Sequence, residues 1–288
     1  MARETPSPAA PRPPIPDSAG EPRILRERID PARVAALHHA LGRAGPPPAE
    51  GEPLPPMWHP LFFAEAAPAS ELMEDGLPRP GAFLPDTGLP RRRRAGGRLE
   101  FLAPIPIGAE AERVSVLQNV AIKQAATGAL AIVTVRHEIL AGSELRLREE
   151  EDLVFRPAWS PDEPPQAEPP SRDERPAFRR EVATDPVLLF RYAALTFNGL
   201  RIHYDHAYAT EREGCPERVV DGMLVAQCLA DLLRDETGRL PKTFEYRAVS
   251  PLYCGQAFAA CGRTLGRKAD LWALTPEGRL ALEARVST

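Results

Sequence analysis

The sequence predicts an α+β protein in two halves, each with antiparallel strands curled around a helix. Two stretches alternate apolar and polar residues as strands do, residues 98–156 and 243–287, and the Pro-rich residues 157–177 separate them from one another. Each half also has one amphipathic helix pattern, at residues 31–41 and 219–234. A chain of 288 residues suits two ordinary domains.

Composition and charge narrow the class of protein. With 43% hydrophobic and 26% charged residues the chain can bury a core. A net charge of −4 gives no broad basic field for phosphates, so we expect no nucleic-acid partner. No apolar run approaches the roughly 20 residues that span a bilayer, and the first residues lack the apolar core of a signal peptide. We therefore expect no membrane contact.

The four cysteines show no C-x-x-C pair and no histidine at metal-ligand spacing. They predict neither a zinc site nor a disulfide framework, so we expect no bound metal and a cytoplasmic location. Prolines gather at residues 6–22, 46–60 and 157–176, which indicates tails and linkers. The predicted domains are a disordered Pro-rich tail at 1–22, an N-terminal half at 23–156, a Pro-rich linker at 157–177 and a C-terminal half at 178–288.

The first helix is predicted from its capping residues. Asp30 is a suitable N-cap, Pro31 suits the first helical position, and Gly42 ends the pattern. The strands that follow are expected at RLEFLAP, ERVSVLQNVAIKQ, GALAIVTVRHEIL and DLVFR. The run Arg91–Arg94 is either a solvated charge run or a group that binds phosphate or carboxylate.

The C-terminal half is predicted as one buried helix inside a sheet. We expect a strand within residues 186–198, and then a helix at 219–234 in which Gln227, Asp231 and Arg234 form a narrow polar stripe. Four more strands follow at TFEYRAVS, QAFAACGRTL, KADLWALT and RLALEARVS. One buried helix in a curled antiparallel sheet is a hot-dog fold, so the whole chain is predicted as a double hot dog.

A dense polar cluster at residues 195–224 is the candidate active site, and it contains Asn198, Arg201, His203, Tyr204 and Asp205. A histidine accepts and donates protons near neutral pH, so His203 is the candidate acid–base residue with Asp205 to orient it. Spacing alone leaves equal room for a structural histidine.

The start of the buried helix is the second candidate. Unpaired N–H groups of Gly222 and Met223 would stabilise a developing oxyanion, as on a thioester carbonyl. Alternatively, Asp221 only caps the helix and Gly222 only permits close packing. No phosphate-binding glycine loop of the dinucleotide or ATP type occurs, so the sequence favours chemistry without those cofactors.

At LTFNGLRIHYDHAYA, VVDGML and YRAVSPLYCGQAF the sequence resembles MaoC-like hydratases with two fused hot-dog halves, specifically the mesaconyl-C4-CoA (3-methylfumaryl-CoA) hydratase and FAS1-like dehydratase group. The segments MWHPLFF, DGLPRPGAFLPDTGLPRRRRAGGRLEF and TGALAIVTVRHEI resemble that group's N-terminal half. The resemblance covers residues 23–288. It implies a hydro-lyase that adds water reversibly to a short, carboxylated enoyl-CoA such as mesaconyl-C4-CoA or itaconyl-CoA, with no cofactor.

The resemblance also implies roles for particular residues. The wider clan carries a D-x-N-x-x-H motif, which places Asn198 at its aspartate position and Leu200 at its asparagine position. An asparagine is no base, so His203 carries the proton transfer, with Asp205 or a water as its partner and Asn198 as the residue that positions the water. The catalytic residues expected are therefore His203, Asp205 and Asn198. The residues expected to bind substrate are Arg201, Tyr204, Gly222, Met223, Arg92, Arg93 and Arg247.

Three other functions stay open at this stage. A 3-hydroxyacyl-thioester dehydratase of fatty-acid synthesis would act on longer, uncharged chains. A non-catalytic acyl-CoA-binding accessory protein would keep the fold without hydration. A hot-dog thioesterase would use a carboxylate near the central helix, which Asp221 could supply. Because hot-dog units pair edge to edge, one fused chain satisfies that pairing, and we expect a monomer or a homodimer.

Overall fold

The computed structural model describes residues 21–125, 128–163 and 168–288. The predicted disorder of residues 1–20 lies outside the described part, as do residues 164–167 of the predicted linker. The domain boundaries stay predictions.

The first helix begins as its capping residues predict. Helix α1 (Pro31–Ala40) follows Asp30, whose carboxylate accepts a hydrogen bond from the Ala32 N–H at 2.9 Å. Val34 and Leu37 are fully buried on one face, so the predicted helix is confirmed.

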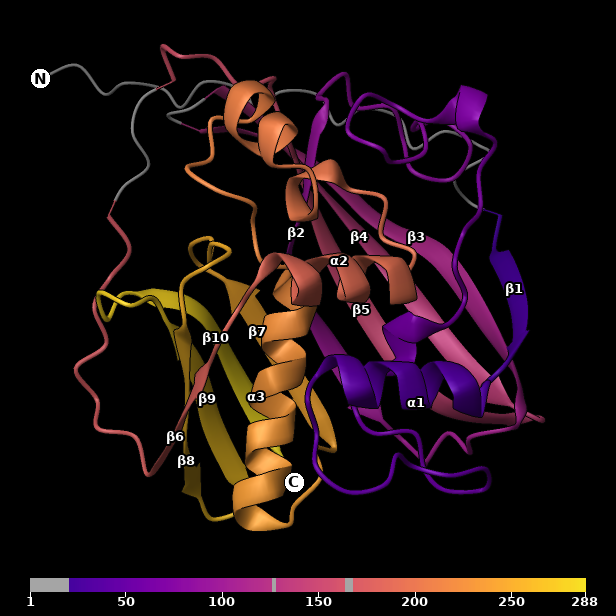
Figure 1. Cartoon of the computed structure of the whole chain (residues 1–288). Coiled ribbons are helices and arrows are strands. Elements are labelled where there is room, and N and C mark those ends of the chain that lie inside the picture. The colour runs from indigo at the N-terminus through magenta and orange to yellow at the C-terminus, as the bar shows by residue number, and fades with distance from the viewer. Residues whose placement is uncertain (1–20, 126–127, 164–167) are drawn as a thin grey trace, which may run out of the picture.

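The ten strands of the described residues belong to one antiparallel sheet. The strands are β1 (Arg23–Arg28), β2 (Arg91–Phe101), β3 (Glu110–Ala125), β4 (Gly128–Ala141), β5 (Glu144–Arg156), β6 (Phe178–Val182), β7 (Thr243–Ala248), β8 (Phe258–Leu265), β9 (Lys268–Leu274) and β10 (Leu280–Ser287). Their order in the sheet is β1-β3-β4-β5-β2-β7-β10-β9-β8-β6. The strands of each half therefore stay together, and the two halves join where β2 pairs with β7 (Figure 1).

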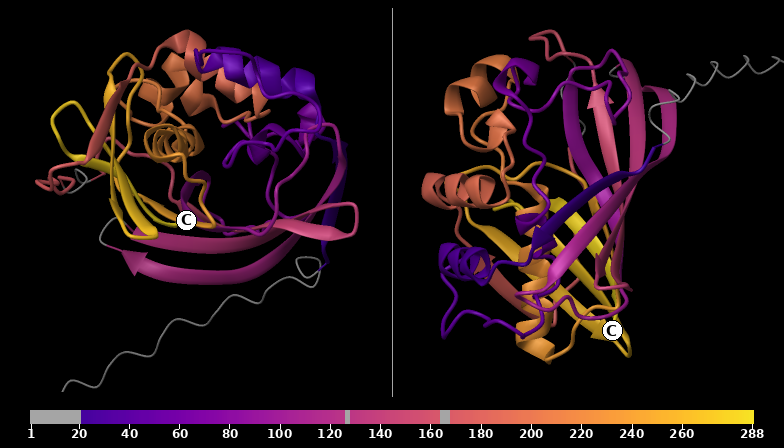
Figure 2. Two further views of the ribbon diagram at one scale, coloured as in Figure 1. Left: turned by 90° about the horizontal axis from the view of Figure 1, so that it is seen from below. Right: turned by 90° about the vertical axis from the view of Figure 1, so that its right-hand side faces the viewer.

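The sheet curls, and the helices lie on its concave side (Figure 2). Helix α3 (Gly222–Thr237) packs against β6, β8, β9 and β10, with Leu229, Leu232 and Leu233 fully buried. This is the helix and sheet arrangement that the C-terminal sequence predicts, and the hot-dog class is confirmed. In the N-terminal half α1 is only ten residues long and packs against α2 (Pro186–Leu195), so the central-helix arrangement is developed in the C-terminal half.

The strand expected within residues 186–198 is wrong, because most of this stretch is helix α2. Asp185 caps α2 by accepting the Leu188 N–H at 2.7 Å, and Pro186 occupies the first turn, as Asp30 and Pro31 do in α1. Leu189, Tyr192 and Ala193 are buried at helical spacing. An Asp-Pro capping pair therefore outweighs the apolar run that suggested a strand.

Two glycines permit the close approach of β2 and β7. A Cβ atom on Gly96 would lie 2.4 Å from the carbonyl oxygen of Tyr246, and one on Gly97 would lie 2.9 Å from the Tyr246 ring. A register shift in the β2–β5 pairing falls between Arg94 and Gly96. The junction between the halves therefore depends on two glycines, Gly96 and Gly97, which leave room for β7.

Candidate active site

A cavity of about 1640 Å³ lies between the two halves, and residues from both line it. Ligand pockets commonly measure about 300–1,000 Å³, so this one has room for a long ligand. The residues that the sequence analysis singled out and that line it are Arg92, Arg93, Asn198, His203, Asp221, Gly222 and Met223.

His203 has a fixed ring orientation. It ends the short 3₁₀ helix Arg201–His203 and is 7% exposed. Its Nδ1 lies 2.8 Å from the carbonyl oxygen of Val219, and because a carbonyl only accepts, Nδ1 carries the hydrogen. Nε2 then holds a lone pair, and it has no hydrogen-bond partner among the described residues. The neutral ring is therefore set up as a proton acceptor on a residue that lines the cavity.

Asn198 and Asp221, which also line the cavity, form one hydrogen-bonded unit. The Asn198 Nδ2 donates to Oδ2 of Asp221 at 2.8 Å, and its Oδ1 accepts the Leu200 N–H at 3.1 Å. Phe197, which precedes Asn198, has φ of 52°, a left-handed conformation that a bulky residue rarely adopts. The Asn198 oxygen keeps a second lone pair, so it can also accept a hydrogen bond from a water.

The start of α3 offers one free donor rather than two. The Met223 N–H donates to Oδ1 of Asp221 at 2.8 Å, so this amide is already paired, and the geometry does not support its predicted contact with substrate. A short N-cap side chain competes for the first amides of its helix, which is the physical reason. No hydrogen bond to the Gly222 N–H is found among the described residues, and it remains the candidate donor.

The structure does not bring Asp205 to His203. The Asp205 carboxylate pairs with Arg201 at 2.7 Å and accepts the Tyr208 N–H at 3.1 Å. These contacts lower the pKa of Asp205, the Tyr208 N–H more than Arg201. The prediction that Asp205 orients the histidine is therefore wrong, and the carbonyl of Val219 has that position.

Three predicted substrate-binding residues lie outside the cavity wall. The Arg201 guanidinium is held by Asp205 and stacks on the Tyr208 ring at 4.5 Å, and the Tyr204 hydroxyl donates to the Gly199 carbonyl at 2.9 Å. Arg247 is on the outer side of β7, paired with Glu283 at 2.8 Å. Each has another partner away from the cavity, so the geometry does not support the prediction that these three residues bind substrate.

The N-terminal half lines the cavity with a charged network that the sequence analysis missed. Glu149 accepts hydrogen bonds from His59 at 3.1 Å and Arg94 at 3.2 Å, and Glu151 pairs with Arg94 at 2.7 Å and His137 at 3.2 Å. Burial opposes ionisation of Glu149, yet His59 and Arg94 outweigh it and lower its pKa. The signal was present in β5, where residues 147, 149, 151, 153 and 155 all face inward.

A loop of the N-terminal half docks on the segment that carries Asn198 and His203. The Arg201 N–H donates to the Asp75 carbonyl at 2.9 Å. A Cβ atom on Gly199 would lie only 2.5 Å from the carbonyl oxygen of Gly76, whose own φ is 87°. The contact therefore depends on two facing glycines, and it ties the N-terminal half to the catalytic segment.

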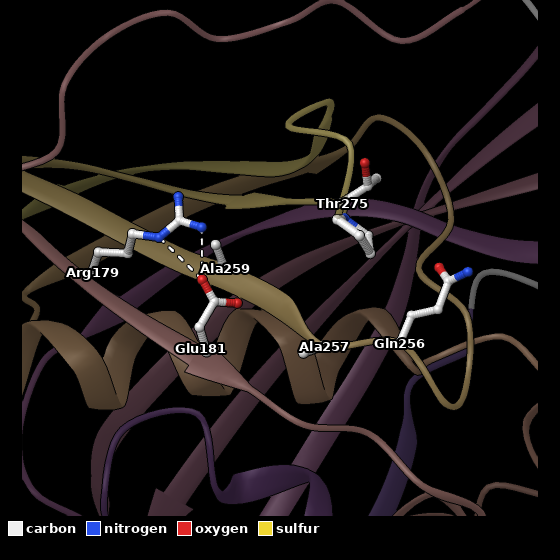
Figure 3. A pocket seen from close by; sticks show the side chains of 7 residues that line it. Arg179, Glu181, Gln256, Ala257, Ala259 and Thr275 are labelled. Carbon is white, nitrogen blue, oxygen red and sulfur yellow. Dashed lines mark hydrogen bonds and ion pairs between the residues drawn. The ribbon is translucent and has the colours of Figure 1, made fainter.

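A second pocket, of about 460 Å³, lies at the β6 edge of the sheet (Figure 3). Arg179 and Glu181 occupy it and pair with each other at 2.6 Å, beside the small side chains of Ala257 and Ala259. None of the predicted site residues lines it. The described residues contain no group of three or more His, Cys, Asp or Glu side chains that could hold a metal ion. They also contain no helix long and apolar enough to cross a membrane.

The double hot-dog sheet and the histidine with its lone pair at the cavity define a hydro-lyase of the MaoC-like class. The chain belongs to the family of hydroxyacyl-thioester dehydratases type 2, whose family model matches residues 57–254. It is 42% identical over 255 residues to the mesaconyl-C(4)-CoA hydratase of Chloroflexus aurantiacus, which covers 88% of this chain and 90% of that protein. The resemblance seen in the sequence is confirmed.

Solved structures agree on the fold. A MaoC-like dehydratase from Phytophthora capsici superposes with a TM-score of 0.66 at 13% identity, covering 93% of this chain and 95% of that one. A Mycobacterium tuberculosis protein with a double hot-dog fold gives a TM-score of 0.57 at 12% identity, covering 94% and 96%. The predicted enzyme class, an acyl-CoA hydratase or dehydratase, is confirmed by the family and the curated relative together.

Proposed function

We propose that the chain adds water reversibly to the double bond of a short enoyl-CoA whose acyl group carries a free carboxylate, as in mesaconyl-C4-CoA or itaconyl-CoA. The observation that carries the mechanism is the Nδ1–H of His203 on the Val219 carbonyl, which leaves Nε2 to act as the base. The relative from Chloroflexus aurantiacus supports the substrate class.

His203 can perform both proton transfers of the reaction. Nε2 takes a proton from water as the water oxygen bonds to the β-carbon, and the electron pair of the double bond moves toward the thioester. The imidazolium then returns the proton to the α-carbon. The atoms balance with one water consumed and no redox change, so the proposed steps need no cofactor. Asn198, with a free lone pair on Oδ1, would position the water.

The thioester oxygen gains negative charge as water adds. The Gly222 N–H at the start of α3 is the proposed donor, because the first amides of a helix point outward and lie at its positive end. Asp221 limits this role to one amide by taking the Met223 N–H. Of the residues expected to bind substrate, we retain Gly222, Arg92 and Arg93.

A dehydratase of fatty-acid synthesis is the second candidate, and the family description favours it. Its substrates need an apolar wall for an alkyl chain. Here Glu149, Glu151, Arg94 and Arg113 line the same cavity, and burying an alkyl chain against them would desolvate charges without compensation. Apolar residues such as Phe62, Phe83 and Ile139 also line the cavity, and the four charged groups favour an acyl group with a polar end.

Two further aspects of the sequence predictions stay proposals. We propose a cytoplasmic location, in keeping with four free cysteines. We also propose that the fused chain works as a monomer or homodimer.

The test follows the ultraviolet absorbance of the conjugated thioester with mesaconyl-C4-CoA, itaconyl-CoA and crotonyl-CoA. His203→Gln should lower kcat by about 100- to 10,000-fold, the range typical of lost acid–base catalysis. His206→Gln is the matched control, because that ring is exposed and pairs only with Glu217 at 3.5 Å. Near wild-type turnover by His203→Gln would sink the mechanism, and preference for crotonyl-CoA would favour the fatty-acid dehydratase.

A further inference from the structure

Strand β2 begins with four consecutive arginines, and three of them form ion pairs with glutamates. Arg91 donates to Glu163 at 2.8 Å, Arg93 to Glu213 at 2.8 Å and Arg94 to Glu151 at 2.7 Å. Arg92 is part-buried in the cavity wall and makes no ion pair with any residue in the described ranges. A guanidinium in that setting lacks the partner that buried charges ordinarily have.

Two of the acids near Arg92 pair with other residues: Glu65 with Arg23 and Arg113, and Glu151 with Arg94 and His137. The third, Asp75, attracts Arg92 without forming an ion pair with it, and its Oδ1 accepts the Leu77 N–H at 2.9 Å.

Burial lowers the pKa of Arg92, but a guanidinium stays protonated in proteins, so its positive charge persists.

We propose that Arg92 binds the free carboxylate of the substrate's acyl group, and so selects carboxylated enoyl-CoA thioesters over uncharged ones. This inference rests on the proposed function. The planar guanidinium matches a carboxylate with two parallel hydrogen bonds, which a lysine cannot do. An uncharged acyl end would cover the part-buried Arg92 without pairing its charge, which is unfavourable.

The experiment compares mesaconyl-C4-CoA with its carboxamide analogue, which keeps the shape and removes the charge. In the wild type kcat/KM should be about 100-fold higher for the acid, as for loss of a charged hydrogen-bond partner. In Arg92→Met the acid should fall to the level of the amide, while the amide changes less than about threefold. Arg92→Lys should retain part of the preference for the acid, since lysine keeps the positive charge but lacks the two parallel N–H donors of the guanidinium.

Arg247→Met is the matched control, because that arginine faces away from the cavity and its loss should leave the preference unchanged. If circular dichroism shows that Arg92→Met misfolds, the acid-to-amide ratios of the wild type and of Arg92→Lys still test the inference. The inference is overturned if the wild type has equal kcat/KM for the acid and the amide, or if the variants lose kcat/KM equally on both substrates. In either case, hydration by the wild type still supports the proposed function. Hydration of neither substrate by the wild type would overturn both.

Discussion

At the residue scale, a backbone carbonyl sets the tautomer of His203, the proposed acid–base residue. Val219 immediately precedes the turn into α3, and its oxygen receives the Nδ1–H of His203. Because a carbonyl cannot change protonation, it holds one tautomer at every pH at which the ring is neutral. The acid–base residue is therefore oriented by the chain path and not by a second titrating side chain.

Asp205→Asn is expected to leave catalysis nearly intact. The carboxylate faces Arg201 and not His203, so kcat/KM should stay within about threefold of wild type, and stability should fall by up to about 1 kcal/mol as for a surface ion pair. Steady-state kinetics and a urea titration measure the two effects. A loss of kcat comparable to that of His203→Gln would show that Asp205 acts on the histidine after all.

Sequence spacing located the catalytic segment but not its partners. His203 and Asn198 both line the cavity, as the polar cluster suggested. Asp205 is two residues from His203, yet a 3₁₀ turn ends at His203 and turns the two side chains to different neighbours. Direction in a turn depends on dihedral angles, which spacing does not report. For the same reason the sequence could not show that Arg92 lines the cavity and Arg201 does not, since both carry the same charge.

At the element scale β2 is the strand that joins the halves and supplies the arginines. It was expected to begin at residue 98 and begins at Arg91. Its pairing with β7 links residues about 150 positions apart, and no local pattern encodes so distant a partner. Local alternation predicted β4 and β10 closely, because most of each strand has one buried and one more exposed face.

Gly96→Ala is expected to disturb the junction of β2 and β7. The new Cβ would lie 2.4 Å from the carbonyl oxygen of Tyr246. Relieving this clash requires a shift of the backbone of β2 or β7, which are paired with each other. Overpacking of this kind costs about 1–3 kcal/mol, which a urea unfolding midpoint measures. Wild-type stability of the variant would mean that the two strands are not held this closely in solution.

The two halves have different tasks at the scale of the whole molecule. The C-terminal half supplies His203, Asn198 and the start of α3, and the N-terminal half supplies the charged wall of the same cavity. Arg43 of the N-terminal half also pairs with Asp231 on α3, which gives this buried carboxylate of the polar stripe its partner. The doubled architecture was predictable from the order of elements, whereas the cavity between the halves needed the β2–β7 pairing.

Gly199→Ala tests whether the halves cooperate in catalysis. A Cβ there would lie 2.5 Å from the Gly76 carbonyl, so the loop of the N-terminal half must retreat and the Arg201 N–H loses its bond to Asp75. Asn198 and His203 flank this position, and a displacement of about 1 Å can cost about 100-fold in rate. We expect kcat/KM to fall by about 10- to 100-fold while far-ultraviolet circular dichroism stays unchanged.

The control for this prediction is Glu74→Ala in the same loop. Its side chain is exposed and pairs only with Arg212 at 2.8 Å, while its backbone carbonyl still receives the Arg201 guanidinium. Activity within about twofold of wild type is expected, as for a surface ion pair. If Gly199→Ala also keeps full activity, the catalytic segment holds its geometry without the N-terminal loop, and that half serves only to line the cavity. A loss of activity that is confined to Gly199→Ala means that the N-terminal half fixes the position of His203, the proposed acid–base residue.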